Sequence, residues 1–142
     1  MASGTAADCI FCKIIRGEIP ASIVYRNELA IAFMDLGPVN PGHLLVAPTS
    51  HAASLSDLVE RDGERMFAMA RRLAGALRRS GLRCEGVNLF LADGEVAGQE
   101  VFHVHLHVVP RFRGDAVRFS WPRSQPSRDE LNAHTAAIRS AL

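Results

Sequence analysis

The chain has 142 residues, a formal net charge of +1 at pH 7 and a hydrophobic fraction of 48%. This length is typical of one domain that buries a core, and the near-zero charge excludes a binder of nucleic acid or membranes that is driven by electrostatics. No apolar run is long enough to span a bilayer, and residues 1–7 have neither the basic nor the apolar part of an export signal. We therefore expect a cytoplasmic protein with a disordered leader over residues 1–7 and a single domain over residues 8–142. Three cysteines in such a chain do not indicate a disulfide framework.

Short apolar runs bounded by turn residues predict a series of strands. Residues 23–26 and 29–35 are expected to pair around the turn Arg26-Asn27-Glu28. A turn over residues 38–42 leads into a buried strand over residues 43–48. Two further strands, 86–92 and 102–110, are expected to form an antiparallel pair.

Two helices are predicted. Residues 56–80 are interpreted as a loop and a long helix that ends at Gly81. Its apolar face is expected to contain Met66, Phe67, Ala70, Leu73, Ala74 and Leu77. Four basic residues, Arg71, Arg72, Arg78 and Arg79, are expected on its solvated face. A loop over residues 113–126 precedes a C-terminal helix over residues 127–141, with His134 on the surface. Helices packed on one antiparallel sheet make an α+β protein.

Three histidines alternate with apolar residues in the stretch His103-Val104-His105-Leu106-His107-Val108-Val109. In a strand, alternate side chains point to opposite faces, so one face would carry only histidines. The run permits two kinds of chemistry. Two of the rings could bind a metal, although all three fit one tetrahedral zinc poorly. Alternatively, a neutral imidazole could attack a phosphate and a charged one could neutralise its oxygens.

The loop over residues 93–99, before the histidines, favours chemistry at a phosphate. Its glycines, Gly94 and Gly98, would allow successive backbone N–H groups to surround an anion. A plain hairpin connection is the more common explanation of such a loop. Beside three histidines, the anion-binding interpretation gains weight.

The pattern from His103 to Val109 resembles the signature of the histidine triad (HIT) nucleotide hydrolases and transferases. Other segments are similar to the same family, over roughly residues 8 to 113: residues 9–15, 17–20, 35–51, 97–102 and 110–111. The resemblance implies a HIT-like α+β fold, with an antiparallel sheet, one long helix and a C-terminal helix. It also implies a bacterial-type member that assembles as a two-fold dimer.

The resemblance implies roles for four residues. His105 would attack the α-phosphorus of a nucleotide and become transiently nucleotidylated, while His107 would donate to a non-bridging oxygen. His43 matches a fourth histidine that supports the triad, although a buried structural histidine is its ordinary alternative. Asp35 lies where the family holds the ribose hydroxyls, and it could instead cap the turn before Pro38.

Further substrate contacts are expected around the triad. The resemblance places Gln99, Glu100 and Val101 beside the phosphate. A purine base would lie against apolar side chains, for which the candidates are Ile10, Phe11, Ile31 and Phe33.

Cys9 and Cys12 form a Cys-x-x-Cys motif, which can be a redox pair, half of a zinc site or a coincidence. No thioredoxin-like context accompanies it. Some members of the family complete a zinc site with two histidines that match His51 and His103. The resemblance thus implies a structural zinc on Cys9, Cys12, His51 and His103, with no catalytic metal. Cys84 stands apart and is expected in the core or in a linker.

Two positions depart from the family pattern. Ala92 replaces a frequent Asn or Gln, so the phosphate contact is either absent or supplied by Asn88 or Asp93. Glu100 replaces a frequent Ser or Thr, and a carboxylate there would repel additional phosphates but could accept a hydrogen bond from an amine. Trp121 is expected either near a site across the dimer or in the core.

The resulting hypothesis is a metal-independent hydrolase of purine nucleoside 5′-phosphoramidates that releases AMP or GMP. Three alternatives remain open. The substrate could be a diadenosine polyphosphate, the protein could be a nucleotide-binding interaction protein with incidental turnover, or the triad could hold a catalytic metal.

Overall fold

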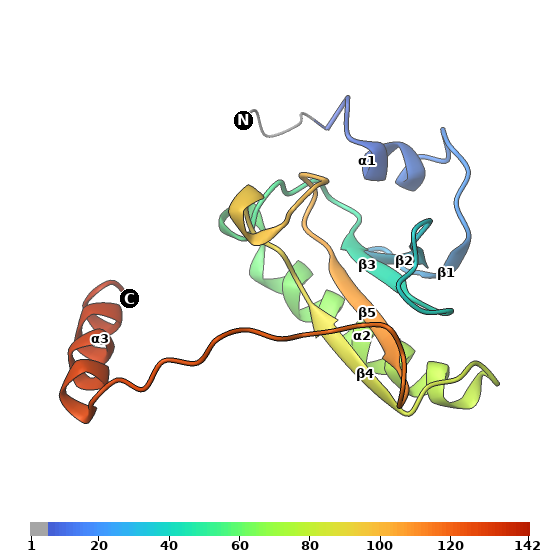
Figure 1. Ribbon diagram of the computed structural model, residues 1–142. Helices are drawn as coiled ribbons and strands as arrows, with labels where there is room; N and C mark the ends of the chain where they lie inside the picture. The colour runs from blue at the N-terminus through green and yellow to red at the C-terminus, as the bar shows by residue number, and fades with distance from the viewer. Residues whose placement is uncertain (1–5) are drawn as a thin grey trace.

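Five strands form one antiparallel sheet in the part of the chain that the computed structural model describes, residues 6–142 (Figure 1). In sheet order these are β1 (Ile23–Arg26), β2 (Ala30–Met34), β3 (Leu44–Pro48), β5 (Leu106–Arg111) and β4 (Gly86–Phe90). The predicted antiparallel pairs β1–β2 and β4–β5 are both present. With its helices, the sheet confirms the α+β prediction.

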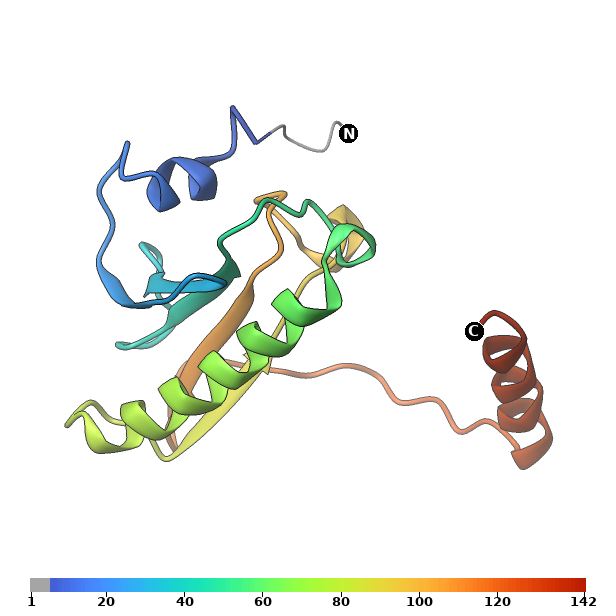
Figure 2. The same cartoon turned by 180° about the vertical axis from the view of Figure 1, so that it is seen from behind.

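Each face of the sheet packs against a helix and contributes to a separate hydrophobic core. One face packs on α2 (Glu60–Arg79), which lies against the sheet in roughly the direction of β5 and β4 (Figure 2). Ala32 and Val46 point to this face, whereas Phe33 and Leu45 point to the opposite face, beneath α1 (Ile10–Ile15). Because β3 is buried on both faces, its sequence is an unbroken apolar run rather than an alternating one.

The apolar face of α2 differs from the prediction at Phe67 and Met69, and the predicted Ala74 is half-buried. Phe67 is 59% exposed, whereas Met69 is buried with Met66, Ala70, Leu73 and Leu77. Residues 66, 69, 70, 73 and 77 follow the three- and four-residue spacing of one helical face, and residue 67 lies about 100° away. The four arginines predicted on the solvated face, Arg71, Arg72, Arg78 and Arg79, are exposed. Gly81, with a φ of +86°, follows its C-cap Ser80.

The helix α1 was not among the predicted helices. It has six residues, and Cys9 is its N-cap, with the sulfur accepting the Cys12 N–H at 3.5 Å. So short a helix shows no periodic pattern in sequence, and it depends on packing for its stability. The Cys-x-x-Cys motif therefore does lie at the start of a helix. Two 3₁₀ turns, η1 (Leu55–Asp57) and η2 (Glu95–Ala97), complete the elements before residue 101.

The histidine strand is shorter than predicted. β5 begins at Leu106. The backbone N–H of Val104 donates to Ala52 O at 2.8 Å, outside the strands, and so does not take part in the sheet. The alternation nevertheless continues, since Val104 and Val108 both lie in the core beneath α2. The three histidines therefore share the opposite face as expected, although only His107 belongs to the strand.

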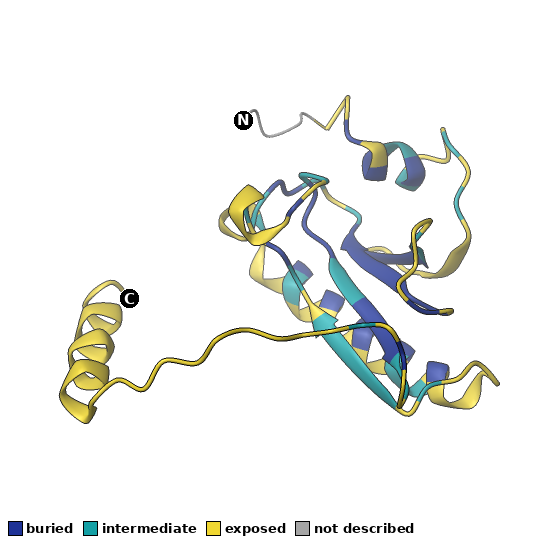
Figure 3. Ribbon diagram, in the orientation of Figure 1, coloured by how far each residue is buried: buried dark blue, intermediate teal, exposed yellow. Residues whose placement is uncertain are grey.

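Residues 118–142 form a C-terminal arm that extends away from the sheet (Figure 1). Its helix α3 (Arg128–Ser140) begins with a capping box between Ser127 and Glu130, close to the predicted limits. Every residue from 118 to 142 is exposed, His134 included (Figure 3). The suggestion that Trp121 packs in the core is wrong, because its exposed fraction is 68%. Most of the predicted leader, residues 1–5, lies outside the described residues.

None of the helices in residues 6–142 is both long enough and apolar enough to cross a membrane.

Candidate active site and metal centre

A cavity of about 650 Å³ opens on the α1 face of the sheet. Its volume lies in the range of small-molecule sites, and its walls are mainly apolar. At one end α1 and β2 contribute Ile10, Phe11 and Phe33. Ile31, the fourth residue expected there, is instead fully buried beneath α1 and is not on the wall. The polar groups on the wall include Asp35, His43, Glu100, His105 and His107.

The ring of His105 is held in one tautomer. Its Nδ1 lies 2.7 Å from the carbonyl oxygen of His103 and must donate to it, because a carbonyl can only accept. The other nitrogen, Nε2, therefore carries a lone pair. Since His105 lines the cavity, a ring with this free lone pair has the chemistry of a nucleophile.

His43 and His107 form a directed pair. Val39 N–H donates to His43 Nδ1 at 3.2 Å, so the proton of the neutral His43 ring is on Nε2. That nitrogen lies 2.9 Å from His107 Nδ1, which therefore accepts. The proton of His107 is left on its Nε2. His105 and His107 thus differ in tautomer, one suited to attack and the other to donation.

Burial keeps these rings neutral. It lowers the pKa of His43 and of His105, and the neighbouring carboxylate of Asp35 opposes the shift in both. Burial, with the nearby rings of His105 and His43, lowers the pKa of His107 to about 4. A nucleophilic lone pair is therefore present at neutral pH.

Asp35 contacts both the turn and the ring of His43. One carboxylate oxygen accepts the Gly37 N–H at 2.8 Å, and the other lies 3.5 Å from His43 Nε2. The two interpretations of Asp35 are therefore compatible, because it caps the turn and still lines the cavity.

In the loop before the triad, the backbone N–H groups that were expected to bind an anion form hydrogen bonds within the loop instead. The N–H groups of Gly94, Ala97, Gly98 and Gln99 all bond within residues 94–99. The buried Gln99 side chain is similarly engaged, since its amide donates to Ala53 O and Val101 O. Of the three expected contacts, Glu100 and Val101 line the cavity and Gln99 does not.

Neither residue suggested as a substitute at position 92 reaches the cavity. Ala92 is buried, Asn88 Oδ1 accepts from Arg111, and Asp93 Oδ1 accepts the Leu55 N–H. The structure therefore gives no replacement for the missing amide among these side chains.

A wall made by β4 and the segment after β5 was not anticipated. Phe90 stacks on His107, with ring centroids 4.2 Å apart and planes at 11°. Val117 and Phe119 continue this wall. The strand alternation places residue 90 on the histidine face, so its position could have been found from sequence. Residues 117 and 119 belong to an irregular segment that carries no such signal.

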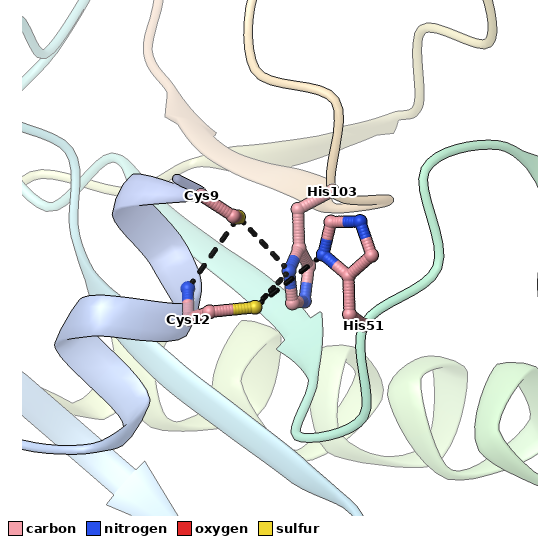
Figure 4. Close-up of side chains that lie close together, drawn as sticks. All are labelled: Cys9, Cys12, His51 and His103. Atoms are coloured by element: carbon pink, nitrogen blue, oxygen red, sulfur yellow. Dashed lines mark hydrogen bonds between the residues drawn. The ribbon is translucent and has the colours of Figure 1, made fainter. Parts of the chain in front are cut away.

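Cys9, Cys12, His51 and His103 point toward one another beside the cavity (Figure 4). A tetrahedral zinc would set its sulfur and nitrogen ligands about 3.6 Å apart, from bonds of about 2.3 and 2.0–2.1 Å. Here Cys9 Sγ lies 3.4 Å from His103 Nδ1, and Cys12 Sγ lies 3.3 Å from His51 Nδ1 and 3.6 Å from His103 Nδ1. These distances fit a zinc site.

The tautomer of His103 also suits a metal. Its Nε2 lies 2.8 Å from Pro48 O and donates to it, which leaves a lone pair on the Nδ1 that faces the cysteines. In contrast, Asp35, His43 and His107 also lie close together, but His43 Nε2 must keep its proton. The four-residue cluster is thus the better metal site.

The helix α1 connects the two sites. Phe11, between the two cysteines, meets the rings of His103 and His105 edge-on, at centroid distances of 5.8 and 5.0 Å. A metal held by these four residues would therefore fix the helix that forms one wall of the cavity.

Residues 16–114 match the HIT domain family. This chain belongs to the HIT family. A HIT family protein from Bacillus anthracis has the same fold, with a TM-score of 0.90, 35% identity, and coverage of 97% of this chain and 99% of that one. The fold predicted from the resemblance is thus confirmed.

Two other relatives of this HIT protein bear on its sites. A zinc-bound histidine triad family protein from Mycobacterium smegmatis matches with a TM-score of 0.77 and 39% identity, over 97% of this chain and all (100%) of the other. An adenosine 5′-monophosphoramidase from Saccharomyces cerevisiae is 35% identical over 126 residues, which cover 88% of this chain and 77% of the relative.

Proposed function

We propose that this HIT protein is a cytoplasmic nucleotide hydrolase that cleaves purine nucleoside 5′-phosphoramidates through a nucleotidyl intermediate on His105. The observation that carries the proposal is the fixed tautomer of His105, which leaves a lone pair on Nε2 of a ring that lines the cavity, with its centroid 5.1 Å from that of His107. The phosphoramidase activity of the yeast relative supports the substrate class.

The reaction takes two displacements. His105 Nε2 attacks the α-phosphorus, and the phosphorus–nitrogen bond breaks as the leaving amine takes up a proton from solvent. Water then attacks the same phosphorus and gives a proton back to solvent, so that the bond to His105 breaks, the ring returns to its neutral form and the nucleoside monophosphate is released. His107 donates its Nε2–H to a non-bridging oxygen in both steps and stabilises the charge that develops there.

The remaining cavity residues bind the nucleotide. The base lies between the apolar side chains of Ile10, Phe11 and Phe33, and Asp35 accepts from the ribose hydroxyls. Val101 lies against the phosphate. The exposed carboxylate of Glu100 disfavours a leaving group made of further phosphates and is compatible with an amine.

Zinc has a structural role in this proposal. Cys9, Cys12, His51 and His103 would bind it and hold α1 in place, while every chemical step uses protein side chains and water. The proposed assembly is a two-fold dimer. The exposed α3, whose apolar residues include Ile138 at 65% exposure, supports it by leaving a face to be covered.

The proposal is tested by measuring hydrolysis of an adenosine 5′-phosphoramidate by the native protein and by His105→Asn. His134→Asn is the matched control, because it makes the same substitution on the exposed surface of α3. We expect His105→Asn to lose turnover while it still binds AMP, and His134→Asn to behave as the native protein.

Native turnover should also survive a short exposure to EDTA. Immediate loss on chelation would instead indicate a catalytic metal. Full turnover by His105→Asn would remove this residue from the mechanism.

A further inference from the structure

Asp115 is a buried carboxylate that the proposed reaction does not use. It is 5% exposed and lies outside the cavity, in the segment that follows β5. Its two oxygens accept five hydrogen bonds: from Arg111 Nε and Nη2, Asn40 Nδ2, Phe112 N and Val117 N, at 2.7 to 3.3 Å. These contacts hold the pKa of Asp115 well below its usual range, with the Arg111 hydrogen bond as the largest cause. So many donors on one carboxylate fix its position closely.

Arg111 extends this network into the cavity wall. Besides its two bonds to Asp115, it donates to Asn88 Oδ1 at 2.8 Å and to Val117 O at 3.1 Å. Its guanidinium carbon lies 5.3 Å from the ring centre of Phe119. The network thus holds the segment that carries Val117 and Phe119, both on the cavity wall.

From Phe119 the contacts continue to a catalytic ring. Phe119 meets Phe90 edge-on, with centroids 6.4 Å apart, and Phe90 stacks on His107 at 4.2 Å. Aromatic rings at these separations favour defined mutual orientations. The orientation of the His107 ring therefore depends on Phe90, and the orientation of Phe90 depends in turn on its contact with Phe119.

A second branch reaches the same pair of histidines through Asn40. The buried Asn40 amide donates to Asp115 Oδ2 at 3.0 Å and to Pro110 O at 2.9 Å. The main-chain carbonyl of Asn40 accepts the main-chain N–H of His43 at 3.1 Å. The main-chain N–H of the preceding residue, Val39, donates to His43 Nδ1. The turn that sets the tautomer of His43 is thus tied to the same carboxylate.

We infer that Asp115 is a positioning residue for this active site. Its five hydrogen bonds hold the Phe119 wall on one side and the Asn40 turn on the other, and together these fix the rings of His107 and His43. The role of this network in turnover rests on the proposed function, whereas its role in placing the His107 ring does not.

The test compares Asp115→Asn and Phe119→Ala with the native, zinc-loaded full chain. Asp115→Asn keeps the shape but puts an NH₂ group among five donors. We expect kcat to fall by about 10- to 100-fold, the loss that follows a misplacement of about 1 Å, with little change in KM. Phe119→Ala should lower kcat in the same direction. Because Phe119 is 48% exposed, this variant will fold even if Asp115→Asn does not.

A second readout follows the His107 ring itself. Stacking on Phe90 shifts the His107 ring protons upfield in the NMR spectrum, and His107→Asn assigns those signals. Both variants should move them toward the values of an unstacked imidazole. A residue that contributed only to overall stability would leave these signals unchanged in the folded fraction.

Glu85→Gln is the matched control. It also neutralises a carboxylate that accepts a hydrogen bond from this segment, at Arg113 N, but Glu85 does not line the cavity. Its kcat and His107 signals should be native. Native kcat and native His107 signals in Phe119→Ala would overturn the inference. If the native protein does not cleave the phosphoramidate, the proposed function fails and the His107 signals alone decide the positioning role.

Discussion

His107 is partly buried and lies beside His105 and His43, and these surroundings affect the pH dependence of stability. Its pKa is about 4 in the folded protein against 6.5 for an ordinary histidine, so the unfolded chain takes up this proton first as the pH falls. The unfolded state then binds more protons, and the free energy of unfolding rises with pH. The contribution of His107 is therefore fully present above pH 6.5 and is lost as the pH falls toward 4.

Urea unfolding between pH 7.5 and 4.5 tests this prediction. The native protein should lose stability more steeply over this range than His107→Gln, which cannot titrate at this position. Equal slopes for the two proteins would contradict it.

Gly42 lies at the turn that leads into His43, and its backbone requires glycine. Its φ is +97°, and an added Cβ would lie 3.0 Å from Leu82 Cδ1 and 3.1 Å from Leu77 Cδ2. We expect Gly42→Ala to lower the free energy of unfolding by about 1–3 kcal/mol through backbone strain and overpacking. Urea denaturation measures the change. Gly86→Ala is the control, because nothing lies within 4 Å of its Cβ and its φ is not positive. Equal losses in both variants would refute the steric argument.

At the scale of elements, α1 should depend on the metal. Cys9 and Cys12 are at its start, and both would lose the metal ion on chelation. We expect the amides of residues 12–15 to exchange hydrogen faster in the chelated protein, while those of β3 keep their protection. Exchange measured by mass spectrometry reports both.

Cys12→Ser should reproduce the chelated pattern without EDTA. Cys84→Ser makes the same substitution at a half-buried cysteine whose thiol donates to Gly86 O, outside the cluster. It should leave α1 protected. Fast exchange of α1 in the zinc-loaded native protein would count against a structural metal.

Sequence periodicity predicted which face of a strand or helix is buried better than it predicted where the element begins and ends. The alternation around His105 placed Val104 and Val108 in the core correctly, but a ladder ends where the backbone N–H finds another partner, as Val104 does at Ala52. The helix α1 was missed because six residues are too few for a periodic signal. Phe67 was wrongly assigned to the buried face of α2, because it is adjacent in sequence to the buried Met66 but about 100° away around the helix.

The sites were predictable to different degrees. The four residues of the candidate metal centre come together as the resemblance implied, because their residue types and spacing are distinctive. The Asp115 network was not predictable. Its Asn40 partner is 75 residues away in the chain, and Arg111 offered no pattern that distinguishes it from a surface arginine.

At the scale of the whole molecule, the C-terminal arm implies a partner surface. A 13-residue helix is marginally stable in isolation, yet α3 buries none of its side chains against its own chain. We expect the full chain to be a dimer in light scattering. Deletion of residues 127–142 should shift the mass toward the monomer at low concentration and leave the strand signal in circular dichroism. A full-length monomer over the whole concentration range would contradict the proposed assembly.

Phe11 lies between two cysteines of the candidate metal centre and against the ring of His105, so the proposed zinc and nucleotide binding equilibria would be coupled through it. If zinc favours the conformation of α1 that the nucleotide needs, the nucleotide must favour zinc by the same factor, because such coupling is reciprocal. A protein saturated with nucleotide would then give up its metal more slowly. A shortage of zinc would be felt first as weaker nucleotide binding, before the sheet itself is disturbed.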